Sequence, residues 1–171
     1  VKIPRWNMDK FPQADPALGT QMKSVGEVMA IGRTFREALL KGMASREDSR
    51  ESLFDNKASQ ASMEQVRHNL IVPNPERIYY LATALDRGMS IDEVHELTHI
   101  DPWFLREIDA LRGLRDRIAG QSLLGLHAKL LREAKRSGMT DAQIGRLLNP
   151  ATGEAAVRAR RKELGIMPVY S

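Results

Sequence analysis

Cysteine is absent from the 171-residue chain, and aromatic residues make up only 5% of it. Without thiols the chain has no disulfides, no thiol nucleophile and no thiolate metal site. No run approaches the roughly 18 apolar residues of a membrane span, and no basic-then-apolar leader opens the sequence. Because a cysteine-free chain also fits a reducing compartment, these absences predict a cytoplasmic protein.

Hydrophobic residues account for 42% of the chain and charged residues for 28%, as in ordinary globular proteins. With so few aromatic residues, the core must be built from Leu, Ile, Val, Ala and Met, which suit helices better than sheets. The spacing of apolar residues therefore predicts an all-α fold, an irregular bundle of about seven short helices with extended N- and C-terminal segments.

The net charge of +4 hides an uneven distribution. Residues 46–112 carry 8 basic and 13 acidic residues, whereas residues 113–171 carry 11 and 5. Three interpretations remain open. The charges are solvated helix faces, or an acidic half lies against a basic half, or the basic residues form a nucleic-acid surface near the C-terminal end.

Both ends of the chain are expected to be extended. Three prolines within residues 1–20 exclude a long helix there, and residues 2–6 are predicted to be an edge strand. Residues 166–170 are short, apolar and extended as well. A lone strand leaves its backbone groups without partners, so we expect the chain to be a piece of a larger protein.

The first helix is predicted to run from Ser24 to about Ala44. Ser24 and Glu27 have the spacing of a capping box, and apolar residues then recur at helical spacing at Val28, Ile31, Phe35 and Leu39. Residues 45–60 are polar and aperiodic, which predicts a linker before a short helix over residues 62–70.

Turn and capping residues are frequent from Asn74 onward. Helix starts are predicted at Asn74-Pro75, Ser90, Asp101-Pro102 and Thr140, and helix ends at Gly88, Gly120, Gly138 and Gly165. Residues 84–90 reappear in similar form at 134–140, so the second half contains two related units of helix, glycine, capped short helix, turn and helix.

Residues 95–99 (HELTH) match the H-E-x-x-H pattern, in which two histidines on one helical face bind zinc. Here Asp101-Pro102 ends the pattern where a zinc-protease helix would continue, and no third histidine follows at the required spacing. We therefore interpret His95 and His99 as surface histidines and predict no metal site.

The two related units also resemble helix-turn-helix motifs, which leaves a nucleic-acid-binding module as the alternative function. The second unit is followed by a helix carrying Arg158, Arg160, Arg161 and Lys162, a set suited to phosphate contacts. The first unit is followed by a helix that carries Glu107 and Asp109 beside Arg106 and Arg112, and this mixture of charges is poorly suited to contacts in a DNA groove.

Three further features are candidate sites. Trp103 and Phe104 open the helix at Asp101-Pro102, where one ring is expected to face the core, and the other is either a half-buried ring or an interface anchor. The polar segment near residues 48–60 is a second interface candidate. Lys23, Ser24 and Glu27 combine a lysine, a hydroxyl and a helix start, which suits an anion, although capping alone explains Ser24 and Glu27.

Several segments resemble the large subunit of carbamoyl phosphate synthetase. Residues 19–33 (GTQMKSVGEVMAIGR) look like the end of its first ATP-grasp unit, and residues 2–6 are similar to the last strand of that unit. Four further segments resemble the helical oligomerisation domain of that subunit: residues 74–78 (NPERI), 88–105 (GMSIDEVHELTHIDPWFL), 130–136 (LLREAKR) and 164–170 (LGIMPVY).

The resemblance implies a division into residues 1–44, the tail of the carboxyphosphate ATP-grasp unit, residues 45–70, a variable linker and short helix, and residues 71–171, the oligomerisation domain. It implies a parent enzyme that joins bicarbonate, glutamine-derived ammonia and two ATP, with Mg²⁺ or Mn²⁺ and K⁺, for arginine and pyrimidine synthesis. None of the catalytic or cofactor ligands falls within this chain, and Lys23, Ser24 and Glu27 are at most supporting residues.

The partners that the resemblance implies are the other domains of the same subunit, a glutaminase small subunit and further copies of the chain. Neither a nucleic acid nor a membrane is among them. The role expected for the chain itself is structural: it spaces two catalytic halves and contributes to subunit contacts.

Overall fold

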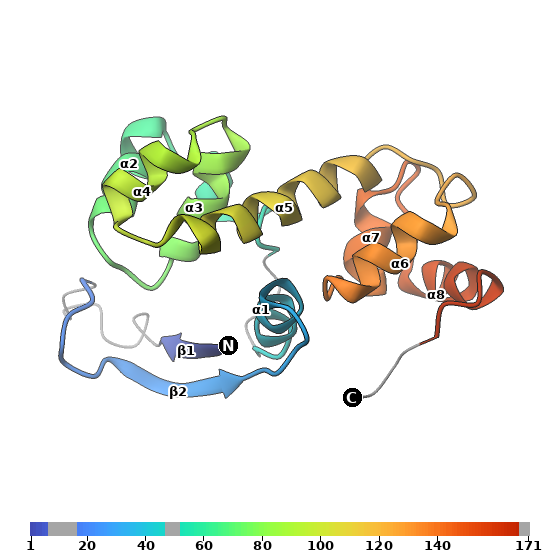
Figure 1. The fold of residues 1–171 in the computed structure, drawn as a ribbon, viewed down its shortest axis with the longest axis horizontal. Helices are drawn as coiled ribbons and strands as arrows, with labels where there is room; N and C mark the ends of the chain where they lie inside the picture. The colour runs from blue at the N-terminus through green and yellow to red at the C-terminus, as the bar shows by residue number, and fades with distance from the viewer. Residues whose placement is uncertain (7–16, 47–51, 168–171) are drawn as a thin grey trace.

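The computed structural model describes residues 1–6, 17–46 and 52–167, and these residues form a mostly helical fold with a small N-terminal hairpin (Figure 1). The predicted all-α class is confirmed. The elements are β1 (Lys2–Trp6), β2 (Ser24–Met29), α1 (Phe35–Ala44), the 3₁₀ helix η2 (Lys57–Gln60), α2 (Met63–Ile71), α3 (Arg77–Asp86), α4 (Ile91–Thr98), α5 (Pro102–Ile118), α6 (Ala128–Arg136), α7 (Asp141–Leu147) and α8 (Glu154–Glu163).

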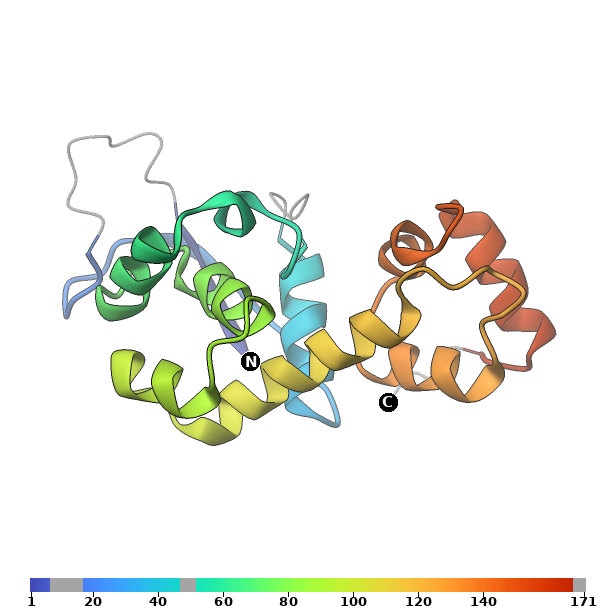
Figure 2. The same cartoon turned by 90° about the horizontal axis from the view of Figure 1, so that it is seen from above.

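Helix α5 joins two groups of helices. The helices α2, α3 and α4 lie around its N-terminal half, and α6, α7 and α8 gather at its C-terminal end, while α1 lies against its middle (Figures 1 and 2). One face of α5 is fully apolar, and its five core residues are each at most 2% exposed: Leu105, Ile108, Leu111, Leu114 and Ile118. Because these residues recur every three or four positions, the sequence pattern alone places them on one face.

The two related units share their local hydrogen bonding. Gly88 and Gly138 both have a positive φ, 87° and 91°, and the methionine after each donates its N–H to the carbonyl five residues earlier, at 3.0 and 3.1 Å. Ser90 and Thr140 then form capping boxes at the starts of α4 and α7. These glycine ends and caps were predicted from the sequence and are confirmed.

The prediction of a helix starting at Ser24 is wrong. Residues 24–29 form β2, which pairs antiparallel with β1, with Ile3 opposite Val28 and Pro4 opposite Glu27. Helix α1 begins at Phe35, eleven residues later, and the Thr34 hydroxyl caps it by accepting the N–H of Glu37 at 3.2 Å. The valines of residues 24–29 favour a strand once a partner strand satisfies their backbone groups.

This hairpin also supplies the partner that β1 was expected to lack. The side chain of Ile3 reaches Gly42 of α1, so the hairpin rests on the helical part through that contact. At the other end of the chain, Ile166 is buried at 5% exposure against the core. Residues 168–170 of the predicted C-terminal extended segment lie outside the described residues.

The start of α3 differs slightly from prediction. Asn74 does not cap α3 directly: its side chain bonds backbone groups of residues 69, 72 and 76, and the helix starts at Arg77. Leu126 is fully buried but precedes α6, which His127 caps. Part of the predicted linker is packed too, because Leu53 and Ala58 are 3% and 2% exposed.

Replacing Arg77 by methionine is expected to lower the free energy of unfolding by about 2 kcal/mol. The Arg77 guanidinium donates to the carbonyls of Leu70 and Thr98, near the C-terminal ends of α2 and α4. Methionine keeps the apolar stem but leaves both carbonyls without this donor. Chemical denaturation measures the loss, and Arg67→Met, whose guanidinium is half exposed and 4.0 Å from Glu93, is the matched control. Equal effects of the two substitutions would contradict the capping role.

Candidate interface surface

Three aromatic rings pack together beside the start of α5. Phe35 of α1 meets Trp103 with the ring centroids 5.7 Å apart and Phe104 at 5.2 Å, and the last two rings are 5.0 Å apart. All three contacts are edge-to-face, the arrangement that aromatic quadrupoles favour. The rings therefore hold one another in place without being enclosed.

The start of α5 fixes where these rings point. The Asp101 carboxylate accepts the N–H of Trp103 at 2.7 Å, and Pro102 occupies the first helical position. Leu105 takes the core position with no exposed area, so the rings of Trp103 and Phe104 remain 47% and 42% exposed. The prediction that one ring would face the core is wrong, because successive helical residues point about 100° apart and Leu105 fills the inward direction.

An open hollow of about 630 Å³ extends this apolar area toward the hairpin. It is lined by residues 30–36 together with Trp103 and Glu107, and Ile31 on its edge is 90% exposed. The ion pair between Arg36 and Glu107, at 3.1 Å, stands at its margin. We call Ile31, Phe35, Trp103 and Phe104 the aromatic surface. An apolar centre with a charged rim is the usual anatomy of a protein interface.

The sequence indicated Trp103 and Phe104 but assigned Ile31 and Phe35 to a helical core face. Phe35 lies 68 positions before Trp103, and no local pattern links them. Ile31 was misplaced because residues 24–34 were predicted to be helical. A strand-forming interpretation of residues 24–29 would have left Ile31 in the turn before α1, where it is found.

Lys23, Ser24 and Glu27 do not surround a helix start. The Lys23 ammonium donates to the carbonyl of Ala17 at 2.6 Å, and Glu27 forms a 2.6 Å ion pair with Lys2 across the hairpin. Ser24 lies opposite Trp6 at the end of the sheet. The helix N-terminus that was expected to attract an anion is therefore not at this place.

The two histidines of the HELTH segment do not share a helical face. His95 lies on α4 with Nδ1 2.7 Å from the carbonyl of Ile100, whereas His99 is the C-cap with a left-handed φ of 56°. Within residues 1–6, 17–46 and 52–167, no group of three His, Cys, Asp or Glu side chains is arranged to hold a metal ion.

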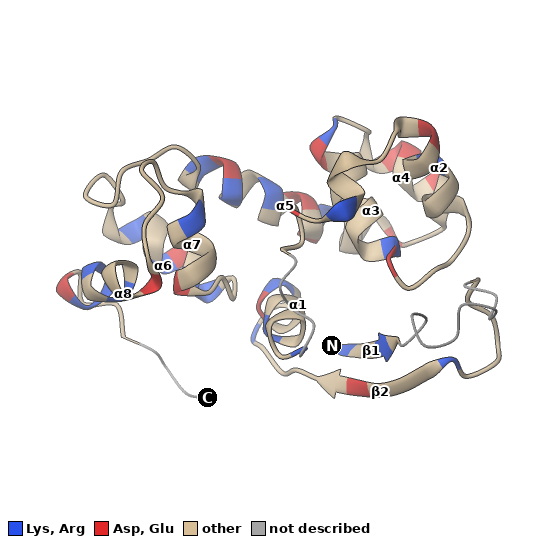
Figure 3. Cartoon of the chain, turned by 180° about the vertical axis from the view of Figure 1, so that it is seen from behind, with Lys and Arg blue, Asp and Glu red and all other residues tan. Residues whose placement is uncertain are grey.

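The basic residues of α8 are largely engaged within the chain. Arg161 is buried and contacts Asp141 at 3.3 Å, Arg158 pairs with Glu154, and Arg160 reaches Glu163 at 3.4 Å. Figure 3 shows acidic segments interspersed with the basic ones on this side of the molecule. A phosphate contact would have to break these pairs, which weakens the nucleic-acid alternative.

In the part of the chain that the structure describes, no helix combines the length and the apolarity needed to cross a membrane.

Comparisons with known proteins agree with these features. Residues 27–165 match the family described as carbamoyl-phosphate synthetase large chain, oligomerisation domain. Over 99% of its length the chain is 44% identical to a carbamoyl phosphate synthase large chain of Xanthomonas campestris pv. campestris and 46% identical to one of Synechocystis, covering 16% of each. It is 45% identical to the N-terminal section of the Aquifex aeolicus large chain and covers 30% of it.

The fold and the aromatic surface define a helical domain that presents an apolar area suited to protein association. The chain belongs to the family of the oligomerisation domain of carbamoyl phosphate synthase large chains. It spans about a sixth of the length of most curated relatives that it matches, with 14–16% coverage.

Proposed function

We propose that this chain is the helical connector between two ATP-grasp halves of a carbamoyl phosphate synthase large chain and that it takes part in subunit association. The observation that carries the proposal is the exposed aromatic surface on a member of an oligomerisation-domain family. In this proposal residues 1–44 close the first ATP-grasp unit, residues 45–70 are a variable linker with a short helix, and residues 71–171 are the association domain.

The proposed parent enzyme forms carbamoyl phosphate from bicarbonate, ammonia released from glutamine and two ATP, in the cytoplasm. Its ATP, Mg²⁺ or Mn²⁺ and K⁺ would bind in the flanking catalytic halves, and a glutaminase subunit would supply ammonia. Lys23, Ser24 and Glu27 would support the edge of the first catalytic half through the hairpin. The full reading frame tests this division, because ATP-grasp sequence on both sides is expected.

We propose that self-association buries the aromatic surface against a second copy of the chain. Trp103 and Phe104 are large, rigid and already braced by Phe35, so ordering them on association costs little side-chain entropy. Hot spots of binding energy are typically such aromatic anchors with a polar rim, which the ion pair of Arg36 and Glu107 provides here.

Replacing Trp103 by alanine is expected to weaken self-association by about 2 kcal/mol, roughly thirtyfold. Sedimentation velocity over a range of concentrations measures the effect. Leu124→Ala is the matched control, since Leu124 is 77% exposed but lies in the turn before α6, away from the aromatic surface. A strictly monomeric wild-type chain at high concentration, or equal weakening by both substitutions, would reject the proposed surface.

The alternative remains a helix-turn-helix module that binds nucleic acid. It predicts a salt-sensitive affinity for duplex DNA that depends on Arg158 and Lys162. A flat binding curve at low salt is what the proposed connector predicts instead.

A further inference from the structure

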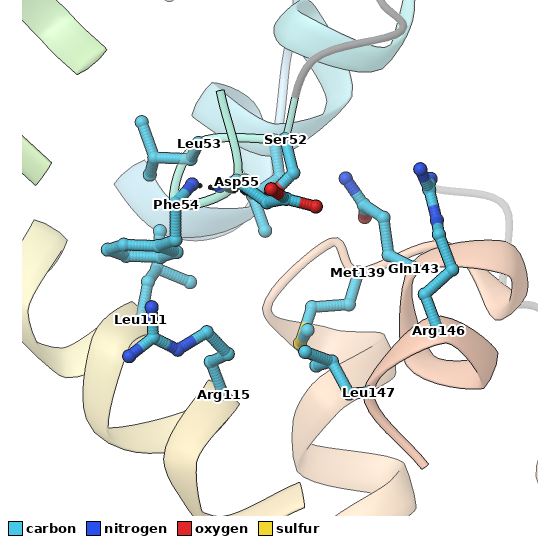
Figure 4. Close-up of a pocket in the computed structure, with 11 residues that line it drawn as sticks. Ser52, Leu53, Phe54, Asp55, Leu111, Arg115, Met139, Gln143, Arg146 and Leu147 are labelled. Carbon is cyan, nitrogen blue, oxygen red and sulfur yellow. Dashed lines mark hydrogen bonds between the residues drawn. The ribbon is translucent and has the colours of Figure 1, made fainter. Parts of the chain in front are cut away.

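A pocket of about 310 Å³ lies between α1, residues 52–55, α5 and α7 (Figure 4). Six apolar side chains line it: Leu40, Leu53, Phe54, Leu111, Met139 and Leu147. Four of these belong to the buried core, so the pocket wall is held by the packing of the fold. Its size falls within the range of small-molecule sites.

The Arg115 side chain forms one wall of the pocket, and its charge is already paired with carboxylates. The Arg115 guanidinium lies 4.9 Å from the centre of the Phe54 ring. The same guanidinium pairs with Asp86 at 2.5 Å and Asp116 at 2.6 Å. Two carboxylates neutralise it, so the interior favours an apolar group rather than an anion.

The opening, or mouth, of the pocket carries an acidic and a basic residue, Asp55 and Arg146, which do not form an ion pair with each other. The Asp55 carboxylate points toward α7, where Gln143 and Arg146 stand (Figure 4). No ion pair joins Asp55 to Arg146 or to any other described residue, and Arg146 makes only a 3.5 Å bond to the carbonyl of Ala142. The Gln143 side-chain oxygen accepts the N–H of Thr140 at 2.9 Å, which leaves its amide N–H groups for another acceptor.

We propose that this pocket binds a free α-amino acid with an apolar side chain. The side chain enters the apolar interior, the carboxylate meets Arg146 and the Gln143 amide, and the ammonium meets Asp55. A zwitterion bridges two opposite charges that are too far apart to pair with each other, whereas an ion of one sign would face a like charge on one side of the mouth. Because the walls come from α1, residues 52–55, α5 and α7, such a ligand would also hold α7 against the segment that precedes η2.

The ligand class can be tested by removing one charge at a time. L-leucine is the probe, and isopentylamine and 4-methylpentanoate keep its apolar body while lacking the carboxylate and the ammonium, respectively. Titration of the ¹⁵N-labelled chain by NMR is expected to give saturable shifts with L-leucine at residues 52–55 and 139–147. Each analogue is expected to bind at least about tenfold more weakly, because each loses one hydrogen-bonded charge.

Variants at the mouth give the second half of the test. Asp55→Asn and Arg146→Gln are each expected to weaken L-leucine binding by about tenfold or more. Asp92→Asn and Arg132→Gln are the matched controls, because both residues are exposed and neither lines the pocket. Absence of saturable shifts, equal binding of all three compounds or unchanged binding by the two mouth variants would each overturn the proposal.

This site does not depend on the proposed association. The titration is repeated on the Trp103→Ala variant, whose substitution lies outside the pocket. Unchanged L-leucine binding there supports the site whatever the oligomeric state, so failure of one proposal is distinguishable from failure of the other.

Discussion

Replacing Gly145 by alanine is expected to lower the free energy of unfolding by about 3 kcal/mol, the upper end of the cost of overpacking. A Cβ at this position of α7 would stand 2.0 Å from the backbone oxygen of Thr152 and 3.4 Å from a methyl of Val157. The Thr152 segment cannot simply retreat, because its N–H donates to the Gly145 carbonyl at 2.9 Å. The added methyl therefore has to push α8 away from α7.

Thermal and chemical denaturation of the chain measure this loss, and Gly113→Ala is the matched control. Gly113 also lies inside a helix, α5, but nothing stands within 4 Å of its added Cβ. There, alanine is expected to raise the stability by about 0.5–1 kcal/mol, because glycine costs conformational entropy in a helix. Opposite signs for the two substitutions are the expected result. Equal signs would show that the packing of α7 on α8 is looser than the contact with Thr152 indicates.

Features that depend on neighbouring residues were predictable from the sequence. The capping boxes at Ser90 and Thr140, the Asp101-Pro102 start and the end at Gly88 each satisfy backbone groups of the same turn. None of these caps and helix ends depends on a residue far away in the sequence. The apolar face of α5 was equally predictable from the sequence, because helical spacing alone sets which side chains share a face.

The hairpin shows why residues 24–29 were misassigned. The Ser24 and Glu27 spacing suits a helical cap, yet Glu27 pairs with Lys2 of a strand more than twenty residues away. A strand pairing of that separation leaves no mark in a local window, and its backbone hydrogen bonds outweigh the cap. The true helix start is capped by Thr34, three residues before Glu37. This capping spacing was overlooked because the predicted helix from Ser24 ran through it.

The candidate interface was predictable only in part. Adjacent aromatic residues at a helix start drew attention to Trp103 and Phe104, but their bracing by Phe35 requires α1 to lie against α5. The apolar pocket was not predictable at all. Leu53, Leu111 and Leu147 each look like ordinary core residues, and the space between them exists only because residues 52–55, α5 and α7, which are far apart in the sequence, meet in the fold without filling it.

A buried ion cluster joins α7 to α8 and to the end of α6. Asp141 is 6% exposed, with Lys135 at 2.8 Å from one carboxylate oxygen and Arg161 at 3.3 Å from the other. Arg161 is itself 8% exposed and also donates to the carbonyl of Ile166 at 2.9 Å. Removing the carboxylate would leave a guanidinium buried without a counter-charge, which is among the costlier single changes a core can suffer.

Replacing Asp141 by alanine is expected to lower the free energy of unfolding by about 3 kcal/mol at neutral pH. Burial raises the pKa of Asp141, but the hydrogen bond and charge of Lys135 and the charge of Arg161 outweigh it, so the pKa lies below the ordinary value. This contribution is therefore complete above the ordinary pKa of an aspartate and is lost as the pH falls through the lowered pKa. Urea denaturation from pH 7 down to pH 2 is expected to show the two proteins converging in stability at the acid end.

Comparing the two proteins isolates Asp141, because the other carboxyls whose pKa is lowered, such as Glu133 and Glu37, are common to both. Asp92→Ala is the matched control, since Asp92 occupies the first turn of α4 but is exposed. It is expected to cost at most about 1 kcal/mol, the value of a carboxylate near a helix start. Adding Arg161→Met to Asp141→Ala should recover part of the loss by removing the unpaired charge. No recovery, or a stability difference that persists unchanged at pH 2, would show that packing rather than charge holds α7 against α8.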